Sequence, residues 1–435
     1  MKKIKNSICI ALFLLSLGLT AQQTPAPKQT QSILITGATA HIGDGTVVPN
    51  SAIGFKEGKL TFVGAAGQAN RADFSRVIDA SGKHVYPGFI AANSSLGLVE
   101  IDAVRATDDD SEIGGVIPHV RSLIAYNAES QVVESVRPNG VLMAQVAPRG
   151  GGVSGSSSIM QLDAWNWEDA VIKADDGLHM NWPNSFTRGR WWMGEDPGIK
   201  PNKNYSKQIE EAKEFMVQAK AYLKATPDTR NLVFEAVKGL FDGTQRLYIH
   251  VDGAREITDA VNTAKAMGVQ NIVIVNGHEA YQVADMLAAN NISVILDRPH
   301  RLPADEDEDI ARPFQLAKLL TDKGVVVSIG MQGEMERMQT RNLPFYAGTF
   351  AAYGLDKEKA VQLITGNAAK ILGIDDRAGT LETGKDATLF ISEGDALDMR
   401  TNQLLHAFIQ GREISLETHQ TQLWKRYMDK YSREK

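Results

Sequence analysis

The middle of the chain alternates short apolar runs with longer amphipathic stretches. The apolar runs of strand length are 141–146, 247–251, 272–275, 292–296 and 325–329. The stretches 254–267 and 280–290 between them have the apolar spacing of helices. Because parallel strands need a crossover, usually a helix, this alternation predicts a parallel α/β domain. A closed barrel fits it best, and an open doubly wound sheet is the alternative.

The two ends of the chain have a different residue pattern from the middle. Short β-type runs at 33–36, 52–55 and 60–63 are separated by glycine-containing turns. Similar runs return at 387–391 and 406–409. We therefore predict that both ends pair into one small β-sandwich beside the central domain.

The N-terminus has the layout of a secretory signal peptide. Lys2, Lys3 and Lys5 precede an apolar run over 8–17, and the small residue Ala21 follows. The alternative is a membrane anchor, but the run is shorter than the roughly 20 residues that a spanning helix needs. We expect a cleaved leader over residues 1–21 and a secreted or periplasmic protein. The only cysteine, Cys9, lies in this leader.

Charge and hydropathy exclude some partners. The leader holds three lysines and no acid, so its removal takes the formal charge from −6 to −9. A negative balance argues against nucleic acid as the main partner. No later stretch is apolar enough to span a bilayer, so we expect no membrane span after removal of the leader.

The segment 85–98, with the sequence VYPGFIAANSSLGL, resembles the first barrel strand of the amidohydrolase superfamily. In that family Pro-Gly-Phe-Ile-Asp-Ala-His-Thr-His supplies two metal-binding histidines. The segment 367–387 closely matches the family's return from barrel to sandwich, and 37–45, 249–252 and 274–279 are similar to family strands. The similarity is strongest to the imidazolonepropionase-like branch. It implies a (β/α)8 TIM-like barrel with a composite β-sandwich formed by both ends of the chain.

The resemblance and the composition together predict the domain boundaries. We expect a signal peptide at 1–21, a flexible lead-in at 22–31, the N-terminal half of the sandwich at 32–86, the barrel at 87–385, the C-terminal half of the sandwich at 386–414, and a polar helix or tail at 415–435.

The resemblance also locates the metal-ligand positions. The family uses two histidines on strand 1, often a lysine or glutamate on strand 4, histidines on strands 5 and 6, and an aspartate on strand 8. The matching positions here are Asn93 and Ser95, the retained His250, Asn276, and Gln332. The strand 4 position is not located.

These substitutions bear directly on the chemistry. A catalytic zinc needs about three imidazole, carboxylate or thiolate ligands, and neutral amides and hydroxyls replace them poorly. The loss of the aspartate also removes a proton acceptor. The sequence thus predicts a non-hydrolytic barrel that binds a small-molecule or peptide-like ligand, or that serves as a partner subunit in a homo-oligomer or beside a related amidohydrolase. No cofactor is expected under this hypothesis.

The alternative is an active hydrolase of carbon–nitrogen bonds, such as those of cyclic amides. His278 lies two residues beyond Asn276 and therefore on the same strand face. With His250 it would hold one divalent metal such as zinc, helped by Asp252 or Glu279. The other histidines, His179 among them, lack a partner at ligand spacing.

A third hypothesis, a carbohydrate- or peptide-binding protein, comes from the Gly/Ser-rich run 148–158 and the tryptophans after it. Arg149, Ser154 and Ser156 in this run are candidate ligand-binding residues, because backbone N–H groups and a guanidinium can receive an anion. A flexible connection without a ligand is the alternative. The tryptophans at 165, 167, 182, 191 and 192 predict either an aromatic patch or core packing.

Overall fold

A computed structural model describes residues 24–196, 198–225, 229–303, 307–333 and 335–433. The predicted signal peptide lies outside the described residues. Within the described ranges, no helix is long and apolar enough to cross a membrane.

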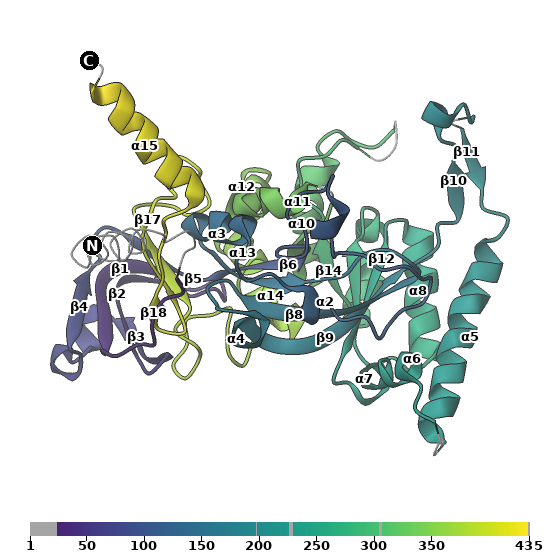
Figure 1. The fold of residues 1–435 in the computed structure, drawn as a ribbon, viewed down its shortest axis with the longest axis horizontal. Helices are drawn as coiled ribbons and strands as arrows, with labels where there is room; N and C mark the ends of the chain where they lie inside the picture. Colours follow the sequence, from purple (N-terminus) through teal and green to yellow (C-terminus); the bar gives the residue numbers. More distant parts are fainter. Residues whose placement is uncertain (1–23, 197, 226–228, 304–306, 334, 434–435) are drawn as a thin grey trace, which may run out of the picture.

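Eight strands close into a barrel at the centre of the molecule (Figure 1). In barrel order they are β6 (Phe89–Ser94), β7 (Val141–Val146), β8 (Val153–Gln161), β9 (Val171–Asn181), β12 (Arg246–Val251), β13 (Ile272–Asn276), β14 (Ser293–Leu296) and β15 (Val327–Met331). Each of the five strands expected from apolar runs is present. The closed sheet confirms the predicted barrel and excludes the open doubly wound alternative.

Helices cover the second half of the barrel as the alternation predicts. α8 (Ala254–Ala266) joins β12 to β13, α9 (Ala284–Ala289) joins β13 to β14, and α10 (Arg312–Asp322) joins β14 to β15. α8 buries Ile257, Val261 and Ala264 at helical spacing. The remaining α-helices are α2 (Ser122–Ala125), α3 (Gln131–Val136), α4 (Trp167–Ala170), α5 (Tyr205–Lys224), α6 (Leu232–Glu235), α7 (Lys238–Asp242), α11 (Glu336–Gln339), α12 (Leu343–Ala352), α13 (Lys357–Leu363), α14 (Gly366–Leu372) and α15 (His419–Arg433).

The expectation of a helix after every strand is wrong between β7 and β9. β8 pairs antiparallel with both β7 and β9, so one barrel strand runs against the others. The connection from β7 to β8 spans only residues 147–152, too few for a crossover helix, and its glycines Gly150 and Gly151 have positive φ angles of 81° and 62°. A short turn of this kind returns the chain antiparallel. The Gly/Ser run is therefore half turn and half buried strand.

Strands from both ends of the chain form one eight-stranded sheet. Its path is β18 (Arg412–Glu413), β17 (Leu404–Ile409), β16 (Leu389–Ser392), β5 (His84–Pro87), β1 (Ile33–His41), β2 (Val47–Lys56) and β3 (Lys59–Ala65), with β4 (Arg76–Asp79) paired to β1. β5 and β16 join the two ends, with Val85 opposite Ile391. The pairing of the chain ends is as predicted, and the further folding of this sheet into a sandwich stays a prediction.

A buried carboxylate ties this sheet to the barrel. Asp163, just after β8, accepts hydrogen bonds from Arg137 at 2.8 Å and from Arg412 of β18 at 2.9 Å. It also accepts one from the backbone N–H of Ala26 at 2.9 Å. The side chain of Asp163 thus connects the barrel to the last strand and to the N-terminal segment.

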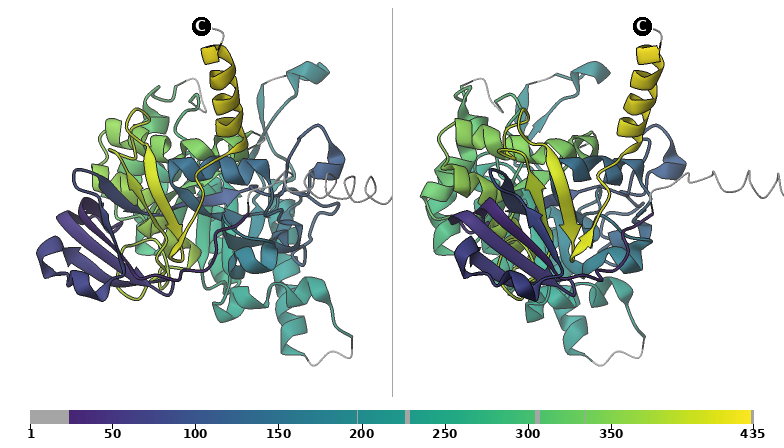
Figure 2. Two further views of the ribbon diagram at one scale, coloured as in Figure 1. Left: turned by 60° about the vertical axis from the view of Figure 1, so that its left-hand side comes forward. Right: turned by 90° about the vertical axis from the view of Figure 1, so that its left-hand side faces the viewer.

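Two elements project away from the rest of the molecule (Figures 1 and 2). One is the hairpin of β10 (Phe186–Arg188) and β11 (Ile199–Pro201), which follows β9. The other is α15, which buries none of its residues.

Candidate functional site

A buried polar network, which we call the first polar layer, lies inside the barrel and is centred on Asp176 of β9. Asp176 is fully buried and accepts hydrogen bonds from Tyr248 at 2.6 Å, Ser157 at 2.8 Å and Gln145 at 2.9 Å. These three donors come from β12, β8 and β7. Burial raises the pKa of Asp176, while the hydrogen bonds from Tyr248 and Ser157 oppose that shift. The network holds the side chain of Gln145, which connects it to a second polar layer nearer the C-terminal ends of the barrel strands.

Two of the expected ligand positions lie in this second polar layer, and their side chains are hydrogen-bonded to each other. The amide Nδ2 of Asn93 donates to Oε1 of Gln332 at 2.6 Å. The backbone N–H of Asn93 donates to Oε1 of Gln145 at 3.0 Å, which connects the pair to Asp176. Strands 1 and 8 of the barrel are therefore joined by neutral amides.

His250 of β12 also lies in this layer, beside a histidine that sequence reasoning left without a partner. Nε2 of His250 lies 2.9 Å from Nδ1 of His179, which is on the neighbouring strand β9. The ring of His179 stacks on Tyr248 with centroids 4.7 Å apart. Strand register brings them together, since His179 stands opposite Tyr248. His179 occupies the fourth barrel strand, where the sequence located no ligand.

The contact between the two imidazoles requires one shared proton. One of the facing nitrogens must donate and the other accept, so they share one N–H. Nε2 of His179 and Nδ1 of His250 are buried without a hydrogen-bond partner among the described residues. Burial lowers the pKa of His250 to about 4, against a smaller opposing effect of Gln332, and lowers that of His179 well below its usual value.

These lowered pKa values predict a loss of stability in mild acid. An unfolded histidine titrates near 6.5, so between roughly pH 6.5 and pH 4 the unfolded chain binds more protons than the folded one. The free energy of unfolding should fall by about 2 kcal/mol from pH 7 to pH 5 through His250 alone. Urea unfolding at both values measures this. A double variant, His179→Gln with His250→Gln, should show a smaller fall, and an unchanged fall would contradict the assignment.

His278 makes its contacts outside the His179 and His250 pair. Its Nδ1 lies 3.3 Å from Asp252, and its Nε2 lies 3.2 Å from Asp297. Both carboxylates follow the ends of barrel strands, β12 and β14. Burial raises the pKa of Asp252, while His278 lowers it. The structure thus surrounds His278 with acids at the C-terminal end of the barrel.

The other expected ligand positions lie where strands end. Ser95 follows β6 and is buried, and Asn276 is the last residue of β13. Asn93 and Asn276 have positive φ angles of 46° and 74°, in the left-handed region that asparagine tolerates better than most residues. The backbone therefore turns sharply at both asparagines.

The candidate residues of the Gly/Ser run are engaged within the chain. Arg149 pairs with Asp110 at 3.2 Å. Ser154 donates to the carbonyl of Gly150 at 2.5 Å, and Ser156 donates to Asp175 at 3.2 Å. A ligand at these residues stays a prediction.

The tryptophans do not form one patch. Because β8 runs antiparallel, Trp165 and Trp167 lie in the β8–β9 connection at one end of the barrel, whereas Trp182 and Trp192 follow β9 at the other. Trp182 is buried, while Trp165 and Trp192 are exposed. The aromatic-patch alternative is therefore wrong, and core packing holds for the buried Trp182.

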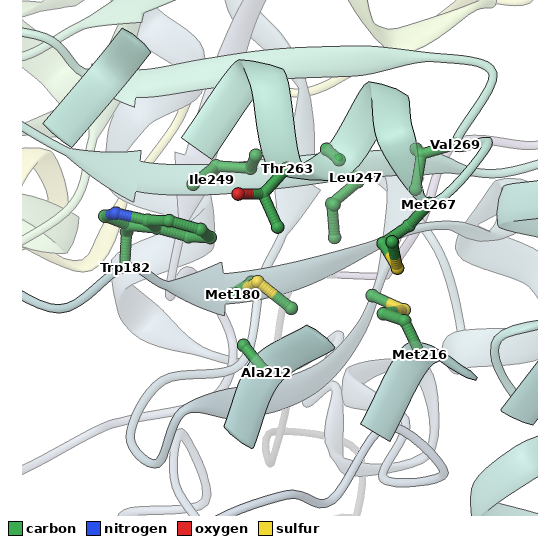
Figure 3. Close-up of a pocket in the computed structure, with 10 residues that line it drawn as sticks. Met180, Trp182, Ala212, Met216, Leu247, Ile249, Thr263, Met267 and Val269 are labelled. Atoms are coloured by element: carbon green, nitrogen blue, oxygen red, sulfur yellow. The ribbon is translucent and has the colours of Figure 1, made fainter. Parts of the chain in front are cut away.

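A small apolar cavity lies between strands β9 and β12 and helices α5 and α8 (Figure 3). Its volume is about 10 Å³, and Met180, Trp182, Met216 and Met267 are among the residues that line it. This is room for at most one water molecule, and an apolar lining keeps such a space dry. It is a packing gap in the helical layer and not a ligand site.

An open groove of about 700 Å³ lies at the opposite end of the barrel from His250, beside the start of β12. Its acids are engaged by neighbours: Asp175 pairs with Arg121 at 2.7 Å, and Glu235 accepts from Tyr222 at 3.0 Å. The groove does not include the polar layers of the barrel interior.

Among the described residues, no group of three or more histidine, cysteine, aspartate or glutamate side chains is arranged to hold a metal ion. The two interior histidines fall outside such an arrangement, and so does His278 with Asp252 and Asp297.

Several comparisons relate the chain to known proteins. The model of the amidohydrolase family matches residues 200–414. No curated protein sequence matches the chain significantly.

Solved structures resemble the fold over most of its length. An amidohydrolase from Thermotoga maritima MSB8 aligns with a TM-score of 0.75 at 23% identity, covering 88% of this chain and 99% of that one. A Xaa-Pro dipeptidase with bound methionine aligns with a TM-score of 0.54 at 15% identity, covering 88% and 100%. An adenosine deaminase from Xanthomonas campestris with bound zinc aligns with a TM-score of 0.54 at 16% identity, covering 94% and 99%.

The structural likenesses agree with the closed eight-stranded barrel, and the family model spans its second half together with the returning strands of the end sheet. Residues 200–414 thus match the amidohydrolase family, and the fold as a whole is that of solved amidohydrolase structures.

Proposed function

We propose that this chain is a non-hydrolytic member of the superfamily, one that acts as a binding or partner subunit. The observation that carries the proposal is the hydrogen bond between Asn93 and Gln332, at 2.6 Å. The family resemblance places metal ligands at both positions. Here each side chain satisfies the other, and neither offers a charged or basic donor to a cation.

The remaining donors do not fit the metal site of the family. A catalytic zinc needs about three imidazole, carboxylate or thiolate ligands. Of the expected set only His250 remains, and its Nε2 faces His179 at 2.9 Å. A hydrogen bond between these two nitrogens uses the atoms that would otherwise point at an ion. We therefore derive no catalytic step through a metal.

The barrel interior also lacks a strong proton acceptor at the positions of the family site. Gln332 replaces the carboxylate that would accept a proton, and an amide does not titrate near neutrality. Burial lowers the pKa of His250 to about 4, so this ring is neutral and a weak base at pH 7. The interior is suited to hydrogen bonding rather than to activating water.

A second candidate function is hydrolysis of carbon–nitrogen bonds, and the contacts of His278 favour it. Two carboxylates, Asp252 and Asp297, flank the two nitrogens of this ring at 3.3 and 3.2 Å. A carboxylate that hydrogen-bonds an imidazole holds its ring in one orientation. Such a ring at the C-terminal end of barrel strands is positioned for acid–base work.

Metal content separates the non-hydrolytic barrel from a metal-dependent hydrolase that uses His250 and His278. We expect the purified chain, incubated with zinc, manganese or iron and then desalted, to hold far less than one ion per molecule by elemental mass spectrometry. A variant with Asn93→His, Ser95→His and Gln332→Asp restores three ligands and should bind about one zinc per chain. Circular dichroism checks that both proteins are folded.

The opposite result is equally specific. About one ion per unmodified chain, lost in His250→Ala, together with turnover of cyclic amides, would establish the hydrolase and exclude the proposal. Loss of that turnover in His278→Gln, with Asp398→Asn at a partly exposed carboxylate as the control, would assign the role to His278.

Two further proposals concern the whole chain. We propose that it is exported, supported by the basic and apolar pattern of residues 1–21. We also propose that the eight-stranded sheet packs as the composite sandwich implied by the resemblance. Its apolar cluster, which includes Ile35, Ile53, Leu389 and Phe408 from both chain ends, supports this.

A further inference from the structure

The projecting helix α15 carries an apolar stripe that its own chain leaves uncovered. Trp424, Tyr427, Met428 and Tyr431 lie at helical spacing on one face and are exposed by 62%, 49%, 51% and 54%. α15 contacts the body at its first residue, where the N–H of His419 donates to Glu134 at 2.7 Å. We call these four exposed residues the α15 stripe. An exposed aromatic face of this kind is typical of an interaction surface.

The rest of α15 is basic. The helix contains Lys425, Arg426, Lys430 and Arg433 against one acid, Asp429, a formal charge of +3 on a chain whose total is −6. Arg426 and Lys430 lie over the rings of Tyr427 and Tyr431 at 5.4 and 5.2 Å. The helix therefore fits an acidic surface with apolar side chains, and like charge disfavours pairing of two α15 helices.

The chain itself presents such a surface. The segment 98–116, which we call the acidic rim, follows β6 at the C-terminal end of the barrel. It holds six acids and one base, a formal charge of −5, and two of the acids, Asp102 and Asp110, already pair with Arg337 and Arg149. It also exposes Ile101 by 56%, Val104 by 42%, Ile113 by 96% and Val116 by 43%. An isoleucine as exposed as Ile113 buries almost none of its apolar surface in the chain.

We propose that α15 of one chain docks on the acidic rim of a second copy. The two surfaces are complementary in charge, and each adds exposed apolar side chains. Both belong to every chain, so two such contacts related by a twofold axis make a closed dimer. The inference does not depend on whether the barrel hydrolyses anything, so it survives or fails separately from the proposed function.

Substitutions that change the charge of either surface test the docking directly. Sedimentation velocity on the mature chain should give a dimer that weakens as salt rises. A helix variant, Arg426→Glu with Lys430→Glu, and a rim variant, Asp109→Lys with Glu112→Lys, should each raise the dimer dissociation constant by about tenfold or more. An equimolar mixture of the two variants should restore dimer, because the unchanged helix of one variant then meets the unchanged rim of the other.

The contribution of the α15 stripe to the dimer is tested separately, with a matched control. Trp424→Ala with Tyr431→Ala should also weaken the dimer by about tenfold or more. Val217→Ala, which trims a side chain of α5 that is likewise 54% exposed, should leave it unchanged. A monomer at all concentrations, or a dimer indifferent to both charge reversals, would overturn the proposal. A monomer whose α15 stripe binds vesicles of anionic phospholipid would also overturn it, since α15 would then serve a membrane surface.

Discussion

Replacing Asp163 with alanine should lower the free energy of unfolding by about 4 kcal/mol. The carboxylate is buried and accepts from Arg137 at 2.8 Å and from Arg412 at 2.9 Å. Burial already lowers the pKa of Arg137, and Asp163 opposes that shift by stabilising its charge. Without Asp163, two guanidinium groups lose their counter-charge and the N–H of Ala26 loses its acceptor. Guanidinium-chloride unfolding followed by circular dichroism measures the loss.

A surface pair provides the control for Asp163. Asp398 bonds to Arg400 at 2.6 Å in a similar carboxylate–guanidinium contact, but Arg400 is largely exposed. Asp398→Ala should leave the free energy of unfolding almost unchanged, because water solvates the charges that remain. Equal losses in the two variants would contradict the role given to Asp163.

Replacing Asp176 with alanine should lower the free energy of unfolding by about 3 to 5 kcal/mol, measured by urea titration. The change leaves the hydroxyls of Tyr248 and Ser157 and the amide of Gln145 without their shared acceptor inside the barrel. Each buried unsatisfied donor costs about 1–3 kcal/mol. Because Gln145 also holds the backbone of Asn93, the amide pair above it should loosen as well.

The adjacent carboxylate tests whether burial causes this effect. Asp175 pairs with Arg121 at 2.7 Å near the surface and has a φ angle of 49°, which asparagine also tolerates, so Asp175→Asn should have a small cost by the same urea titration. In the Asp176→Ala variant, slowed or unchanged amide hydrogen exchange at Asn93 would contradict the proposed connection between the layers.

Much of the barrel follows from hydrophobic pattern alone. The run 141–146 is a strand with the predicted bounds, and the helix predicted at 254–267 is α8 at Ala254–Ala266. Fully buried parallel strands are continuous apolar runs, which makes them visible in a sequence. β8 was missed because its serines, such as Ser156 and Ser157, are buried by hydrogen bonds rather than by hydrophobicity.

The candidate site was predictable only in part. The resemblance placed Asn93 and Gln332 at facing ends of strands 1 and 8, and the structure brings them into contact. The contact of His179 with His250 was missed because it depends on the register between β9 and β12. Periodicity tells which side chains share a face, but it does not determine the register between neighbouring strands.

The union of the two chain ends determines when this protein can finish folding. Val85 and Ile391 face each other across β5 and β16, so the sheet needs strands made at the start and the close of synthesis. Contacts so distant along the chain form slowly, because a long loop must close before they stabilise anything. A ribosome-bound chain that has not yet released its C-terminal strands would leave β5 with an exposed edge, because β16 is its partner on that side. Until release, that edge is open to pairing with other chains unless a chaperone or delayed collapse protects it.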